Sequence, residues 1–69
     1  MRVELHAYDE AGPRLAVLEL PEAIAMGVQR EDLLSVPQGD GNEAGVYRVL
    51  SRWLYVGDLS LLLGVAKVR

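Results

Sequence analysis

Arginine and aromatic side chains alternate in one short segment, residues 46–58, which reads VYRVLSRWLYVGD. Aromatic rings on which bases stack, combined with cations that contact phosphates, are the chemistry of single-stranded nucleic-acid binding. Both kinds of side chain must then share one exposed face. The candidate residues for nucleic-acid binding are Tyr47, Arg48, Arg52, Trp53 and Tyr55.

The faces that these side chains occupy depend on the regularity of the strand. A regular strand places the two arginines on one face and the three aromatic rings on the other, because successive side chains alternate. A β-bulge near Ser51 would change this parity and bring Trp53 to the face of Arg48. The alternative interpretation places Trp53 and the tyrosines in the core or in a subunit interface. The alternation favours this alternative and leaves the geometry at Ser51 open.

The segment 38–45, QGDGNEAG, has the G-x-G-x-x-A spacing of a dinucleotide-binding fingerprint at Gly39, Gly41 and Ala44. That fingerprint requires a following helix, whose N-terminus binds the pyrophosphate. A strand is expected after this segment instead. The segment is therefore predicted to be a hairpin loop, and no cofactor is expected.

The same loop begins like a calcium-binding loop, with Asp40 and Asn42. Ala44 and Ser51, however, occupy positions where such a loop requires its ligands. The alternative to a plain hairpin loop is weak calcium binding through Asp40, Asn42 and Glu43. We predict no metal site.

His6 is the only histidine, and the chain has no cysteine. Alternation places it on the polar face of the first strand with Glu4 and Tyr8. A zinc site needs further nitrogen or sulfur ligands, which this chain lacks. We expect His6 to be a surface residue without a binding role.

Conventional catalytic groups are also sparse. Ser35, Ser51 and Ser60 would each need a positioned base to act as nucleophiles, and His6 is the only conventional candidate. The adjacent acidic pairs, Asp9-Glu10 and Glu31-Asp32, lie in turn-like segments and are predicted to be solvated charges. No catalytic residues are assigned, and the protein is predicted not to be an enzyme.

Hydrophobic patterning predicts five strands and one helical turn. Residues 1–8 alternate cleanly between apolar and polar side chains, as a half-buried strand does. Pro21 and Glu22 suit the start of a helix, and Gly27 suits its end. Residues 46–56 also fit a helical period, but their β-branched and aromatic side chains favour a strand. The other expected strands are 14–20, 32–37 and the hairpin partner of 46–56, residues 59–68.

Strands of this number, joined in sequential hairpins, acquire a common core when the sheet bends into a small barrel. The expected fold is a single all-β domain over residues 1–69, a five-stranded SH3-like or OB-like partly open barrel. The segments LELPE (18–22) and YRVLSR (47–52) resemble short uncharacterised bacterial proteins with an SH3-like barrel. This resemblance implies a fold but no activity.

The size of the chain favours self-association. A domain of 69 residues buries a limited share of its surface, and 51% of these residues are hydrophobic. Without cysteine, oligomerisation is the common remaining source of stability. We predict an interaction or assembly module that forms a homo-oligomer, most simply a dimer, with a protein partner as a further option. The predicted interface residues are Leu59, Leu61, Leu62, Leu63 and Val65.

Charge is unevenly distributed along the chain. The net charge is −3, which disfavours broad attraction to nucleic acid or to an anionic membrane. Residues 46–69 nevertheless carry +3 and residues 1–45 carry −6. The chain opens without the pattern of a secretory signal and has no apolar run of membrane-spanning length. A cytoplasmic location is expected.

Overall fold

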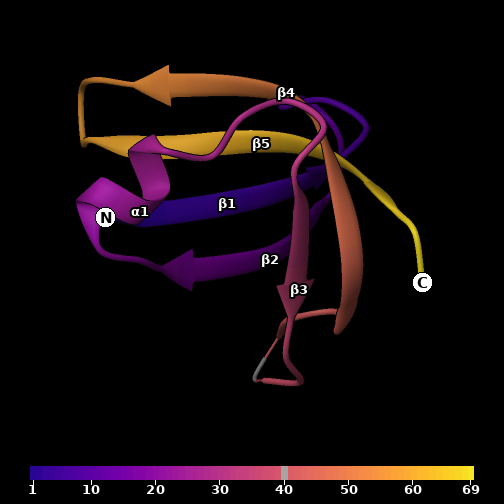
Figure 1. Cartoon of the computed structure of the whole chain (residues 1–69). Coiled ribbons are helices and arrows are strands. Elements are labelled where there is room, and N and C mark those ends of the chain that lie inside the picture. The colour runs from indigo at the N-terminus through magenta and orange to yellow at the C-terminus, as the bar shows by residue number, and fades with distance from the viewer. Residues whose placement is uncertain (40) are drawn as a thin grey trace.

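Residues 1–39 and 41–69, which the computed structural model describes, form a five-stranded sheet and one short helix (Figure 1). This confirms the predicted all-β class. It also confirms a strand over residues 46–55, whereas Val56 lies in the turn that follows. The elements are β1 (Arg2–Ala7), β2 (Arg14–Glu19), α1 (Glu22–Met26), β3 (Leu33–Val36), β4 (Gly45–Tyr55) and β5 (Ser60–Lys67).

The strand order is β2-β1-β5-β4-β3, and the sheet curls into a half-barrel compatible with a small SH3-like or OB-like fold (Figure 1). Neighbouring strands are antiparallel except for β1 and β5, which run parallel. The expectation of sequential hairpins is wrong at one point. β2 and β3 lie at opposite edges of the sheet, because the segment containing α1 carries the chain from one edge to the other.

Side chains from the strands fill a core on one face of the sheet. In β1, Val3 and Leu5 point to this face and are completely buried, as their alternation predicts. In α1, only Ala25 is buried, and Gly27 follows the helix as its C-cap. The buried apolar residues are Val3, Leu5, Ala16, Ala25, Val28, Val36, Tyr47, Val49, Leu61, Leu63 and Val65.

The burial of β5 corrects the predicted interface. Leu61, Leu63 and Val65 are at most 1% exposed within a single chain. They pair in register with β1 on one side and with β4 on the other, so they occupy the centre of the core. They cannot contact a second chain unless the fold opens. Of the five predicted interface residues, Leu62 is half-buried and Leu59 is exposed.

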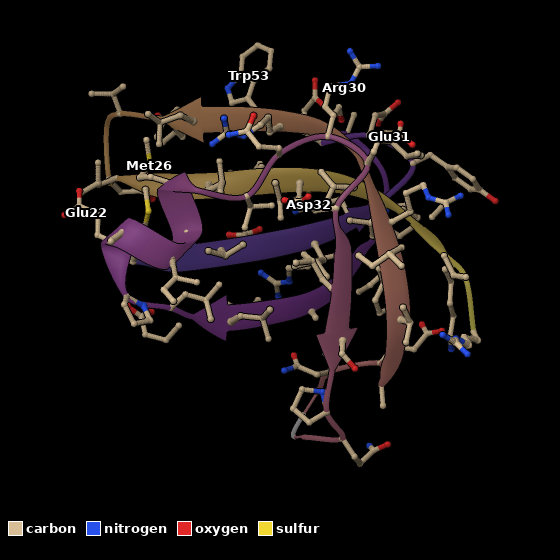
Figure 2. The ribbon with its side chains drawn as sticks, in the orientation of Figure 1. Glu22, Met26, Arg30, Glu31, Asp32 and Trp53 are labelled. Atoms are coloured by element: carbon tan, nitrogen blue, oxygen red, sulfur yellow. The ribbon has the colours of Figure 1, made fainter. Side chains whose placement is uncertain are left out.

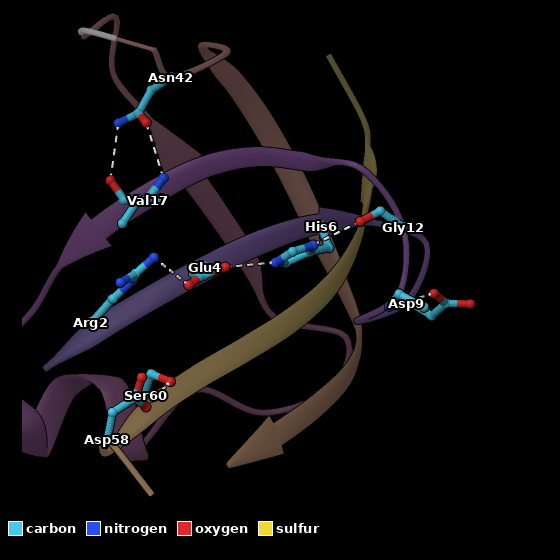
Figure 3. Close-up of polar contacts among 10 residues, drawn as sticks. Arg2, Glu4, His6, Asp9, Gly12, Val17, Asn42, Asp58 and Ser60 are labelled. Atoms are coloured by element: carbon cyan, nitrogen blue, oxygen red, sulfur yellow. Dashed lines mark hydrogen bonds and ion pairs between the residues drawn. The ribbon is translucent and has the colours of Figure 1, made fainter. Parts of the chain in front are cut away.

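Asn42 connects the loop before β4 to the free edge of β2. Its side-chain Oδ1 accepts a hydrogen bond from Val17 N at 3.0 Å, and its Nδ2 donates to Val17 O at 3.4 Å (Figure 3). Glu43 N donates to Leu15 O at 3.0 Å. The loop therefore takes the place of a neighbouring strand, and β2 does not present a bare edge at Leu15 and Val17.

We predict that Asn42→Ala exposes the β2 edge. Two hydrogen bonds are lost, and the exposed backbone at Val17 becomes free to exchange with water. The expected cost is about 1 kcal/mol of unfolding free energy. Amide exchange followed by NMR should show a faster Val17 N–H, while the amides of β5 change only with global stability. An unchanged Val17 exchange rate would show that the side chain contributes nothing to this edge.

Tyr47 anchors the same loop from inside the core. Its ring is fully buried, and its hydroxyl donates to Glu43 O at 2.6 Å. Burial raises the pKa of Tyr47 above its ordinary value of 10.0, and the nearby negative charge of Glu43 acts in the same direction. The Glu43 carboxylate also accepts a hydrogen bond from Lys67 Nζ at 3.0 Å, which raises the pKa of Lys67.

This burial predicts a loss of stability in alkali. Because the pKa of Tyr47 is raised by folding, its stabilising contribution is complete below pH 10.0 and decreases as the pH rises above that value. Tyr47→Phe removes the ionisable group at the cost of one hydrogen bond, about 1 kcal/mol at neutral pH. Urea unfolding at neutral pH and above pH 10 should show a smaller alkaline loss in this variant than in the wild type. Equal losses of unfolding free energy in the two proteins would show that Tyr47 does not cause the alkaline loss of stability.

Candidate interaction surface

A β-bulge in β4 determines where the aromatic and basic side chains point. Val49 pairs with Val65 and Ser51 pairs with Gly64, so Leu50 has no partner in β5. Residues opposite each other in a ladder share a face. The bulge therefore reverses the alternation of β4 after Val49. The sequence left open whether this strand is regular or has a bulge near Ser51. The structure has the bulge, and Leu50 is the extra residue.

The bulge places Arg48 and Trp53 on the same face of the sheet. Trp53 pairs with Leu62, and Arg48 pairs with Ala66. Leu62 and Ala66 alternate with the buried residues of β5, so they lie on the face opposite the core, which we call the outer face. Tyr55 also lies on this face, because it is two residues beyond Trp53.

Two of the five candidate nucleic-acid-binding residues do not join this outer face. Tyr47 is completely buried in the core and cannot stack on a base. Arg52 pairs with Leu63 and so projects to the core face, where its Nη2 donates to Met26 O at 3.4 Å. Its Nε is buried and has no hydrogen-bond partner among the described residues. Arg52 thus links β4 to the end of α1.

The remaining three candidates are accessible. Trp53 and Tyr55 are each 54% exposed, and Figure 2 shows Trp53 projecting away from the sheet. Arg48 is exposed, and its Nε lies 4.0 Å from a carboxylate oxygen of Glu31. The interpretation that Trp53 belongs to the core of the single chain is therefore wrong, whereas a place in a subunit interface stays a prediction.

Apolar side chains gather at the end of the β4–β5 hairpin. Residues 56–59 form the turn, in which Asp58 Oδ1 accepts a hydrogen bond from Ser60 Oγ at 2.7 Å (Figure 3). The exposed fractions of the apolar residues here range from 40% to 75%. We call this group the hairpin patch; it comprises Trp53, Leu54, Tyr55, Val56 and Leu59.

Helix α1 extends the apolar surface beside the hairpin. The hydrogen bond from Arg52 to Met26 O brings the end of α1 close to β4, and the Met26 side chain is 40% exposed (Figure 2). Sequence reasoning missed Leu54, Val56 and Met26 as surface residues. For Leu54 and Val56 a signal was present in Gly57-Asp58, because this pair indicates a turn and so places both residues at the end of a hairpin.

His6 is not the surface residue that its pattern predicted. Its side chain is only 13% exposed. Its Nδ1 lies 2.8 Å from Gly12 O, and its Nε2 lies 3.0 Å from Glu4 Oε1 (Figure 3). Glu4 also accepts from Arg2 at 2.7 Å. The Nδ1 contact fastens the 8–13 loop to β1, and Nε2 contacts Glu4 within β1 itself.

Three of the other candidate catalytic groups, Ser60, Asp9 and Asp32, form hydrogen bonds within their own turns. Ser60 is bound to Asp58, and Ser51 Oγ is buried without a hydrogen-bond partner in the described part of the chain. Asp9 accepts from Ala11 N and Asp32 from Gln29 N, so both stabilise turns. None of these hydrogen bonds joins a serine to His6.

Two of the three residues of the calcium alternative have other partners in the described structure. Asn42 is engaged with Val17, and Glu43 with Lys67. Asp40 lies outside the described residues. Within residues 1–39 and 41–69, no group of three or more His, Cys, Asp or Glu side chains is arranged to hold a metal ion, and no pocket is present.

No helix in the described ranges has the length and apolar character needed to span a membrane. Comparison of the chain with protein-family models, with curated proteins and with solved structures finds no match.

Proposed function

We propose that this protein is a non-enzymatic interaction module that self-associates, with a homodimer as the basic unit, through the hairpin patch. The observation that carries the proposal is the exposure of five large apolar side chains at one end of a single hairpin. Large exposed apolar groups that gather at one place in a soluble protein mark interaction sites.

The hairpin patch is separate from the core. Eleven apolar residues drawn from the strands, α1 and the segment after it already fill the interior of one chain. The hairpin patch adds nothing to that interior, and each of its residues leaves at least 40% of its surface in water. Because burial of apolar surface is favourable by about 25 cal/mol per Å², contact between two patches would stabilise a chain too small for a large core.

The residue types in the hairpin patch suit an interface. Trp and Tyr are enriched among the residues that dominate binding energy, because they bury a large area with few rotatable bonds. Trp53 and Tyr55 lie on one face of β4, and Leu54 lies on the other. A partner that approaches the hairpin end-on or edge-on therefore meets apolar side chains from both faces.

Sedimentation equilibrium over a range from about 1 µM to 1 mM tests this proposal, since such a range covers the affinities of weak and moderate dimers. We expect the weight-average mass to rise from that of a 7.6 kDa chain toward twice that value. A mass that stays monomeric at the highest concentration would contradict self-association.

A second candidate function is single-stranded nucleic-acid binding by Arg48, Trp53 and Tyr55. The observation that favours it is the bulge, which brings this cation and these rings to one face. The ion pair of Arg48 with Glu31 and the net charge of −3 weigh against it. Titration of labelled single-stranded DNA should then show binding at low salt that weakens as salt rises. Absence of binding at low salt excludes this function.

A further inference from the structure

The outer half of β4 has a backbone edge without a neighbouring strand. β3 pairs with β4 only over the segment from Gly45 to Arg48. Beyond the bulge, residues 51–55 pair with β5 on one side. On the other side, no hydrogen bond within the described residues engages the backbone of 51–55.

Adjacent parts of the sheet edge are covered. Val49 exchanges backbone hydrogen bonds with Glu31 and Asp32. Arg30 Nε donates to Leu50 O at 3.1 Å, so the backbone carbonyl of the next residue along this edge also has a partner. At the β2 edge, the Asn42 side chain is hydrogen-bonded to the backbone of Val17. At the β3 edge, the strand is only four residues long and is followed by Pro37. The longest uncovered stretch in the described structure thus begins directly after Leu50.

This stretch has few of the features that prevent strands from pairing with other chains. Natural edges are protected by lysines, prolines and inward-pointing charges. Residues 51–57 contain no lysine and no proline, and their one charged side chain, the inward-pointing Arg52, is the only protective feature of this kind among them; it donates to Met26 O at the end of α1. The neighbouring side chains, from Trp53 to Val56, are apolar and exposed.

We propose that two copies of the chain pair antiparallel along this edge, residues 51–55 of one beside residues 51–55 of the other, so that the two sheets become continuous. The inference rests on the proposed self-association and specifies its geometry. Backbone pairing supplies the hydrogen bonds of the free edge, and the hairpin patches of the two copies meet on both faces of the joined sheet.

Charge favours a second copy as the occupant. The uncovered stretch has a basic group at one end, Arg30 at Leu50, and an acidic group at the other, Asp58 in the turn. Antiparallel pairing about a twofold axis brings the Asp58 end of each copy toward the Arg30 end of the other. In Figure 2, Arg30 and Trp53 both project beyond β4, which leaves Arg30 accessible to this contact.

The same reasoning selects a register. A twofold axis at Arg52 would place two like charges opposite each other, which is destabilising in a ladder. An axis at Trp53 instead places Arg52 opposite Leu54 of the other copy and brings the two indole rings together. This register also aligns Ser51 with Tyr55, so the whole uncovered stretch takes part.

Residue-specific amide exchange by NMR, at dilute and at concentrated protein, tests the inference on the unaltered chain. We expect the outward-facing amides within residues 51–55 to exchange at least tenfold more slowly in the dimer. Val17 N–H provides the matched control, because its hydrogen bond to Asn42 lies at the other edge and should not depend on concentration.

The outcomes separate this inference from the proposed function. A dimer by sedimentation in which the amides of 51–55 gain no protection overturns edge pairing and leaves self-association through side chains in place. A chain that stays monomeric at 1 mM overturns both. Protection confined to residues 51–55 in the dimer supports both.

Discussion

Alanine in place of Trp53 is expected to weaken self-association by about thirtyfold or more, which corresponds to about 2 kcal/mol, the lower limit for a hot-spot residue. The side chain is 54% exposed in the single chain and lies outside the core. Its loss should therefore change the unfolding free energy of the monomer by no more than about 0.5 kcal/mol. The variant separates binding from folding.

Leu33→Ala is the matched control for this prediction. Leu33 has a similar exposed fraction, 53%, and lies in β3, away from the hairpin turn. Sedimentation equilibrium should show a dissociation constant near that of the wild type for Leu33→Ala and a much larger one for Trp53→Ala. If the two variants dimerise equally well, Trp53 is not part of the interface.

Valine in place of Gly64 is expected to have the largest effect on folding. Gly64 lies in β5 opposite Ser51, next to the bulge. A Cβ atom at this position would lie 2.4 Å from Ser51 Oγ, 2.5 Å from Tyr8 O and 2.6 Å from Asp9 Cα. Two of these atoms belong to the backbone of the 8–13 loop, which is held against β5 by the hydrogen bond from Tyr8 N to Val65 O.

The expected cost of Gly64→Val is about 3 kcal/mol or more, at the upper end for overpacking. A domain of this size has a small margin of stability, so much of the population should be unfolded or disordered at room temperature. Gly39→Ala is the control, because the nearest atom to its added Cβ, Asn42 Nδ2, is 3.8 Å away. Urea unfolding monitored by circular dichroism compares the two. A cooperative Gly64→Val transition at the wild-type midpoint would contradict the close packing at this site.

The elements of the fold could be predicted from local patterns. The alternation in residues 1–8 identifies β1, and Pro21 and Gly27 bound α1, because these signals depend on neighbours in the sequence. The order of the strands could not be predicted in the same way. The parallel pairing of β1 with β5 joins the two ends of the chain, and no local signal records that contact.

The candidate surface was only partly predictable for a related reason. The sequence singled out Trp53 and Tyr55, but their face depends on the bulge at Leu50. That bulge lies opposite Gly64, where the 8–13 loop crosses the sheet, so its position depends on segments about 40 residues away from Leu50. The same distant contacts explain the error in β5. The apolar run in β5 was predicted to be an interface because the sequence does not show that β1 and β4 lie on either side of it, with Leu61 and Leu63 buried in the core.

The exposure of Trp53 to a soluble quencher, measured across protein concentration, tests the central claim most directly. Trp53 is the only tryptophan, so its fluorescence reports on the hairpin patch alone. We predict that acrylamide quenching decreases and the emission maximum shifts to shorter wavelength as the protein passes from dilute to concentrated solution, because the ring becomes buried between two chains. A quenching constant and an emission maximum that stay the same from about 1 µM to 1 mM, a range that spans moderate to weak dimers, would contradict self-association through this surface.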